Sequence, residues 1–159
     1  MNVQNPAPYP PLGIERRDPS ILPILNRLYA GGQGELTATL SYQYQTILLA
    51  RKDPRLSQIL SDLAASESCH LEILGRLIVL LGGNPTYRDL ETKQFWTGQW
   101  VSPWGPDACC RMLLQDLQRE VEAADRYLAV ARRMPDRKIA AMLRRMAMDE
   151  VTHGQVLRE

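Results

Sequence analysis

The chain has 159 residues, 45% of them hydrophobic, and its 19 basic and 18 acidic side chains leave a formal net charge of only +1. This length suits one domain with a substantial core, and the near-neutral charge argues against nucleic acid or an anionic membrane as a partner. No stretch approaches the roughly 20 consecutive apolar residues of a membrane span. Three cysteines without a C-x-x-C pair argue against a disulfide framework, a zinc ribbon or a rubredoxin-type iron site. These features favour a reducing, cytoplasmic setting.

The N-terminal residues 1–17 are polar and rich in proline. We expect them to form an extended arm, because proline removes backbone donors, and no signal peptide, because an apolar stretch is missing. Residues 18–159 are then expected to form the folded domain. Its first element is a short helix at about residues 19–30, after which the glycines of "GGQG" interrupt the helical pattern.

Four longer helices are predicted beyond this point, at about residues 33–52, 54–81, 107–133 and from 137 to the end of the chain. Asp53-Pro54 is typical of a helix start, and Gly82-Gly83 is typical of a helix end. The stretch "NPTYRDLETKQFWTGQWVSPWGPD" between the second and third helices contains glycine and proline too often for a long helix. No segment alternates polar and apolar residues convincingly, so we predict no sheet.

This pattern predicts an all-α fold, a ferritin-like four-helix bundle with one long crossover between its second and third helices. The two short connections make two antiparallel helix pairs, and the long connection carries the chain back along the bundle. Trp96, Trp100 and Trp104 recur within the crossover, and we expect them to seal it onto the bundle or onto a partner subunit. The arginine-rich segments "ARRMPDRK" and "LRRM" are predicted to lie on a solvated surface.

An internal repeat carries the functional information. Each of the two histidines follows a glutamate by three residues, and the pair Glu67 and His70 precedes the matching Glu150 and His153 by 83 positions. One helix upstream in each half, a glutamate is followed seven residues later by a tyrosine. These two pairs, Glu35 with Tyr42 and Glu120 with Tyr127, are 85 positions apart. A single Glu-x-x-His is weak evidence, whereas two copies that use both histidines and share an upstream partner are strong evidence.

Helical periodicity places the repeated residues on the apolar face of each helix, since residues three, four and seven apart share one face. Glu120 falls with Leu117 and Tyr127, for example, whereas Glu122 falls with charged neighbours on the solvated side. Buried carboxylates repel one another and lose hydration, so this arrangement is very costly without a cation. The inward carboxylates and imidazoles are Glu35, Glu67, His70, Glu120, Glu150 and His153.

One glutamate from each of two helices and Glu-x-x-His from each of the other two is the ligand set of di-iron and di-manganese bundles. Two divalent ions would balance the four negative charges, and hard oxygen ligands with imidazole suit iron or manganese. The sequence therefore predicts two divalent metal ions, manganese or iron. Tyr42 and Tyr127 either donate hydrogen bonds that fix the orientation of the ligating carboxylates or simply pack in the core.

The segments "YAGGQGELTATLSYQYQ" and "ILSDLAASESCHLEILG" resemble the first two bundle helices of the manganese catalases and of related spore-coat proteins. The remainder resembles small rubrerythrin-like and bacterioferritin-like proteins. The resemblance implies that Glu35, Glu67, His70, Glu120 and His153 bind the two metals. For Glu150 it leaves two roles, a proton handler near the metals as in manganese catalases, or a ligand as in ferritin-like di-iron sites. The chain differs from manganese catalases in ending directly after its fourth helix, and from rubrerythrins in lacking the cysteine pairs of a rubredoxin domain.

Three functions are compatible with this pattern. The first is disproportionation of hydrogen peroxide, in which Glu150 moves protons and no external reductant is needed. The second is a ferroxidase or a rubrerythrin-like peroxidase that uses iron, dioxygen or peroxide, and electrons from a separate partner. The third is a non-enzymatic assembly or coat component, whose metal site mainly holds the helices together. We expect a homo-oligomer in each case, located in the cytoplasm or in a spore coat.

Overall fold

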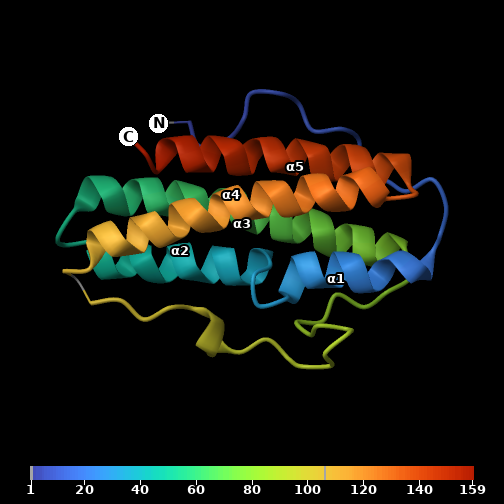
Figure 1. The fold of residues 1–159 in the computed structure, drawn as a ribbon, viewed down its shortest axis with the longest axis horizontal. Coiled ribbons are helices and arrows are strands. Elements are labelled where there is room, and N and C mark those ends of the chain that lie inside the picture. Colours follow the sequence, from blue (N-terminus) through green and yellow to red (C-terminus); the bar gives the residue numbers. More distant parts are fainter. Residues whose placement is uncertain (1, 106) are drawn as a thin grey trace. The chain divides into compact units, whose positions relative to one another are not determined.

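The computed structural model describes residues 2–105 and 107–159, so Met1 of the predicted arm and Pro106 of the predicted crossover lie outside the described part. Every regular element in this part of the chain is a helix, and a single isolated bridge joins Arg88 to Phe95. The all-α prediction is therefore confirmed. The elements, in chain order, are η1 (Pro19–Ile21), α1 (Leu22–Ala30), α2 (Glu35–Leu49), α3 (Pro54–Leu80), η2 (Gly98–Trp100), α4 (Cys109–Arg133) and α5 (Arg137–Val156) (Figure 1).

The helices fall into two compact units, each built around one helical hairpin. In the unit Arg16–Pro103, α2 and α3 pack against each other across a tight turn. Asp53 caps α3 by accepting a hydrogen bond from the Leu56 backbone N–H, at 2.9 Å, and Pro54 follows at the first helical position. α3 ends at Leu80, and Gly82 follows the C-cap residue Leu81 with a φ of +87°, in the left-handed region that favours glycine.

α1 and α2 follow one another nearly end to end in this unit (Figure 1). The break between them falls at the glycine-rich turn Gly31–Gly34, where the sequence pattern predicts an interruption. α2 is shorter than the predicted range of 33–52, because Gly34 has an extended backbone and caps the helix, so that Glu35 becomes its first residue.

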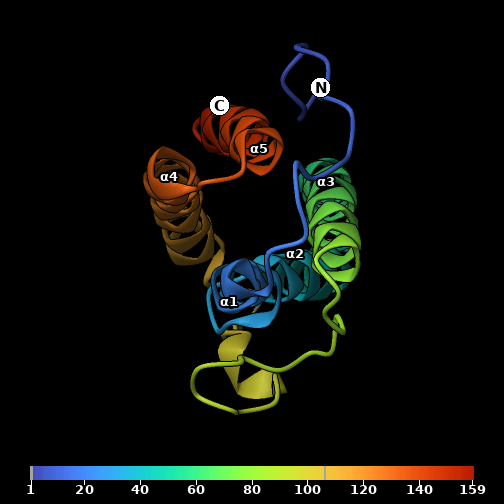
Figure 2. The same cartoon turned by 90° about the vertical axis from the view of Figure 1, so that its right-hand side faces the viewer.

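The crossover, defined here as residues 84–103, runs beside α1 and α2 within the same unit (Figure 2). The Asn26 side chain on α1 accepts a hydrogen bond from the Leu90 N–H at 2.9 Å. The rings of Tyr29 and Tyr87 stack with centroids 5.7 Å apart. Burial, together with the neighbouring Tyr87, raises the pKa of Tyr29 to about 12, so Tyr29 stays neutral near neutral pH. The crossover is thus fastened to α1 by several specific contacts.

The second unit comprises the N-terminal residues up to Glu15 together with Trp104–Glu159. Its hairpin consists of α4 and α5, which pack against each other. Asp136 caps α5 by accepting hydrogen bonds from the N–H groups of Lys138 and Ile139, at 3.0 and 3.1 Å. The same carboxylate accepts a hydrogen bond from the Glu15 N–H at 2.6 Å, which ties the end of the arm to the start of α5.

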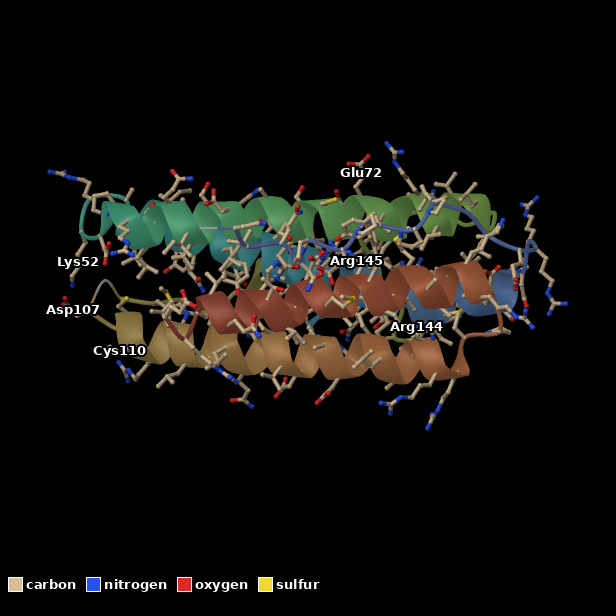
Figure 3. The ribbon with its side chains drawn as sticks, turned by 90° about the horizontal axis from the view of Figure 1, so that it is seen from above. Lys52, Glu72, Asp107, Cys110, Arg144 and Arg145 are labelled. Carbon is tan, nitrogen blue, oxygen red and sulfur yellow. The ribbon has the colours of Figure 1, made fainter. Side chains whose placement is uncertain are left out.

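Asn5, Ala7 and Tyr9 of the arm contact α5, and the side chain that anchors them corrects one prediction. Arg145, part of the segment "LRRM" predicted to lie on a solvated surface, is only 6% exposed. Its guanidinium donates to the backbone carbonyls of Asn5 and Ala7, at 2.7 and 2.6 Å, and lies 4.2 Å from the ring centre of Tyr9. The neighbouring Arg144 is exposed, as predicted (Figure 3). The boundary between arm and folded domain at residues 17 and 18 stays a prediction.

Among the described residues, no helix combines the length and the apolar character required to cross a membrane.

Candidate metal centre

The hairpin of α2 and α3 brings together three of the predicted ligands. Glu35 is the first residue of α2, and Glu67 and His70 lie one turn apart on α3. The Nδ1 atom of His70 lies 3.3 Å from Oε2 of Glu67 and 3.6 Å from Oε2 of Glu35. We refer to Glu35, Glu67 and His70 as the N-terminal half-site.

The hairpin of α4 and α5 repeats this arrangement. Glu120 lies on α4, and Glu150 and His153 lie one turn apart on α5. The Nδ1 atom of His153 lies 3.3 Å from Oε2 of Glu120 and 3.3 Å from Oε2 of Glu150. We refer to these three residues as the C-terminal half-site. The repeat in the sequence is therefore also a repeat in geometry, with one imidazole nitrogen facing two carboxylates in each hairpin.

Burial makes the charge on each half-site energetically important. All six side chains belong to residues that are at most 5% exposed. Within each half-site, one ligand atom from each of the three residues lies within 4.8 Å of the others. Two carboxylates held this close in a water-poor interior repel one another, and each ionised group loses several kcal/mol of hydration unless a counter-charge replaces it.

A divalent cation fits this donor set. Each half-site offers carboxylate oxygens from two glutamates and one imidazole nitrogen, a hard set of donors that suits manganese or iron. Because the Nδ1 atom is the ring nitrogen that faces both carboxylates, it is the nitrogen available to a shared ion. One divalent ion in each half-site would balance two carboxylate charges. The three free cysteines belong to neither half-site.

Glutamates outside the repeat serve as a comparison. Glu72, two residues beyond His70 on α3, points outward and pairs with Arg76 at 2.5 Å (Figure 3). Glu122 on α4 is exposed and accepts a hydrogen bond from the Gln118 side chain at 2.8 Å, so its predicted place on the solvated side is confirmed. Helix periodicity alone separated the surface residue Glu122 from the buried residue Glu120.

The two predicted tyrosines are buried. Tyr42 lies two turns beyond Glu35 on α2, and Tyr127 lies two turns beyond Glu120 on α4. Burial is expected both for a tyrosine that donates a hydrogen bond to a ligating carboxylate and for one that only packs in the core, so it does not distinguish the two roles. Their part in orienting the carboxylates therefore stays a prediction.

One buried charged group beside the C-terminal half-site was missed by the sequence reasoning. Asp149, fully buried and adjacent to Glu150, pairs with Arg145 across 2.7 Å and accepts a hydrogen bond from the Asn5 N–H at 2.7 Å. The hydroxyl of Tyr9 donates to its other oxygen. The only signal in the sequence is the spacing of Arg145 and Asp149 by four residues, which also occurs on solvated helix faces.

Comparison with known proteins points to a single family. The family model described as manganese-containing catalase matches residues 10–95, more than half of the chain and the whole N-terminal half-site. A probable manganese catalase from Clostridium acetobutylicum is 23% identical over 166 residues, covering 92% of this chain and 72% of that protein. The chain also resembles KatB, a manganese catalase from Anabaena PCC7120, in its crystal structure. The two sequences are 22% identical, the alignment covers 97% of this chain and 76% of the KatB chain, and the TM-score is 0.81. A second structure, of wild-type KatB, gives the same values. This likeness confirms the predicted fold class, the ferritin-like four-helix bundle.

Proposed function

Because the chain belongs to the family of manganese-containing catalases, we propose that it disproportionates hydrogen peroxide to water and dioxygen at a centre of two manganese ions. The observation that carries the proposal is the repeated geometry of the two half-sites, with two buried carboxylates facing one imidazole Nδ1 in each hairpin. A protein that needed one structural ion would not require this arrangement twice.

The ligands follow from the half-sites. The N-terminal half-site holds one ion through Glu35, Glu67 and His70, and the C-terminal half-site holds the other through Glu120 and His153, with Glu150 as a further ligand or as a proton handler. One divalent ion would balance the two carboxylate charges of each half-site, which lowers the cost of burying these groups.

When bound, the two metals would supply Lewis acidity and the two electrons that pass between the peroxide molecule reduced to water and the one oxidised to dioxygen. The protons released by the oxidised peroxide are those required by the reduced one. Glu150 is the catalytic group that we assign to this transfer, since its carboxylate is buried next to His153 and can hold a proton between the two halves of the cycle. Burial of the site limits the access of bulk water to that carboxylate.

Iron is the alternative metal, because it accepts the same oxygen and nitrogen donors. With iron, the same half-sites would support a ferroxidase or a rubrerythrin-like peroxidase. Such a peroxidase needs electrons from a separate donor, whereas the catalase cycle takes them from peroxide itself. A structural role, as an assembly or coat protein whose metals only hold the helices, is the third candidate.

We also propose that the chain assembles with copies of itself and functions in the cytoplasm. Tyr87 and Phe95 of the crossover are 52% and 65% exposed, and Trp100 is 41% exposed. Exposed aromatic side chains of this kind are commonly covered by a partner subunit.

Oxygen evolution tests the proposed activity. Metal-free protein is loaded with manganese(II) or with iron(II) and given hydrogen peroxide without a reductant. The manganese form should release one dioxygen for every two peroxide molecules consumed. Peroxide consumption that requires an added reductant would favour the peroxidase, and a protein inert with both metals would leave the structural role.

A further inference from the structure

The glycine-rich turn before α2 determines where Glu35 lies. Gly31 ends α1 and Gly34 caps α2, and the Gly34 N–H donates to the Gly31 carbonyl oxygen at 2.8 Å. A Cβ atom on Gly34 would lie 2.5 Å from the Leu28 carbonyl oxygen, so only glycine fits at this close approach. Glu35 comes directly after this turn. The first turn of a helix lacks part of the hydrogen bonding that holds later turns, so the turn and its outside contacts fix the position of this carboxylate.

The crossover supplies such a contact. The indole Nε1–H of Trp96 donates to the Thr37 hydroxyl at 2.8 Å, although the two residues are 59 positions apart. The same hydroxyl lies 3.5 Å from the Gly31 carbonyl oxygen, to which it donates a long hydrogen bond. Thr37 is buried, and its backbone N–H donates to the Gly34 carbonyl at 3.0 Å. Trp96 is thereby connected, through one buried hydroxyl, to both ends of the turn that precedes Glu35.

A second aromatic residue of the crossover covers the same turn. The ring of Trp100 packs so closely on Gly32 that a Cβ atom there would lie 2.6 Å from the ring. Two tryptophans of the crossover therefore contact the four-residue turn, one through a hydrogen bond and one through ring packing. This concentration of contacts goes beyond the general sealing role that the sequence predicts for these tryptophans.

We propose that Trp96 is a positioning residue for Glu35, acting through the Thr37 hydroxyl, and that it sets the affinity of the N-terminal half-site for manganese. The inference rests on the proposed function, in which Glu35 is a metal ligand. A ligating carboxylate binds well only when it is held close to its productive position, and groups that hold ligands in place commonly change metal affinity by about 10- to 100-fold when they are lost.

Two conservative substitutions isolate the hydrogen bond. Trp96→Phe keeps an aromatic ring but removes the N–H donor, and Thr37→Val keeps the shape of the side chain but removes the hydroxyl. Thr37→Ser retains the hydroxyl and serves as the rescue variant. Phe95→Leu, next to Trp96 but 65% exposed and in contact with Arg88, is the matched control for altered crossover packing.

The experiment titrates manganese(II) into the full metal-free chain and follows binding by competition with a fluorescent chelator. Trp96→Phe and Thr37→Val should each weaken the binding of one of the two ions by about tenfold. The double variant should bind no more weakly than Thr37→Val alone, because Thr37→Val already removes the hydrogen bond that Trp96→Phe removes. Thr37→Ser and Phe95→Leu should bind both ions as the wild type does.

Wild-type affinity for both ions in Trp96→Phe and Thr37→Val would overturn the proposal, even if both variants unfold at lower temperature, because Trp96 would then only fasten the crossover. Equal loss in Phe95→Leu would overturn it as well. These outcomes are distinct from failure of the catalase proposal. A wild type that binds two manganese ions but evolves no oxygen would contradict that function, while the comparison of affinities would still decide the role of Trp96.

Discussion

Arg145 and Asp149 lie one turn apart on α5 and form a buried ion pair, with 2.7 Å between Nη1 and Oδ1. Each of the two charged side chains also forms hydrogen bonds with other residues. Backbone groups of Asn5 and Ala7 and the hydroxyl of Tyr9 form further hydrogen bonds with the pair. The hydrogen bonds from the N-terminal arm thus take the place of the water that this buried ion pair would otherwise need. The acidic member of the pair, Asp149, directly precedes Glu150 in the sequence.

Substitution of the two adjacent arginines tests this role of the arm. Arg145→Met should lower the free energy of unfolding by about 3–5 kcal/mol, because it leaves the Asp149 carboxylate buried without its partner. Arg144→Met removes the same charge from an exposed position of the same helix, so it should change stability by less than about 0.5 kcal/mol. Urea unfolding of the metal-free proteins gives both values. Equal effects of the two substitutions would show that the ion pair contributes nothing specific.

Loss of one imidazole should empty one half-site. His70→Ala removes the nitrogen donor of the N-terminal half-site and leaves two carboxylates that repel one another, so manganese content should fall from two ions to about one per chain. The remaining ion loses its redox partner, and oxygen evolution should be abolished. His153→Ala is the matched variant in the C-terminal half-site and should behave alike. Retention of two tightly bound ions in either variant would contradict the assignment of that histidine.

Substitution of Glu150 separates its two roles. Glu150→Gln preserves the shape of the side chain but removes its charge and its ability to accept a proton. If Glu150 is mainly a proton handler, the variant should keep two metals per chain and lose most peroxide turnover, as much as 100-fold or more for a general acid–base group. If it is a ligand, metal content and turnover should fall together. Metal analysis and oxygen evolution on the same sample decide between these results, and full activity would exclude both roles.

Removal of the metals should destabilise the protein. Two buried carboxylates lie close together in each half-site and repel one another when the metal is removed, so the melting temperature should fall on chelation and recover when manganese is added back. At a free concentration 100 times the dissociation constant, each bound ion should add about 2.7 kcal/mol. Calorimetry over a range of manganese concentrations measures this linkage. A melting temperature that is independent of manganese would contradict the presence of a metal site in the folded state.

The half-sites could be predicted from the sequence because their geometry is local. A glutamate and a histidine three residues apart on a helix share a face wherever that helix lies, and the repeat marks this face as a candidate site. The ends of the helices were predicted less accurately than their faces. α2 begins at Glu35 and not at residue 33, and α4 begins at Cys109 and not near residue 107, because the caps depend on backbone conformations that residue type determines only in part.

The contacts that periodicity could not predict join segments far apart in the chain. Arg145 was placed on a solvated surface because its neighbours on α5 are charged, yet it is buried by an arm 140 residues earlier in the sequence. The hydrogen bond between Trp96 and Thr37 joins the crossover to the first turn of α2. A proline-rich arm and a glycine-rich crossover have no regular period, so the sequence does not show which face of which helix they cover.

The central claim is that the two half-sites hold a pair of manganese ions that disproportionates peroxide. Protein purified from its native host should be analysed for metals, and oxygen evolution from hydrogen peroxide should be assayed on the same sample. We predict two manganese ions per chain and one dioxygen for every two peroxide molecules, without a reductant. Two manganese ions in a protein that is inert to peroxide would contradict the account.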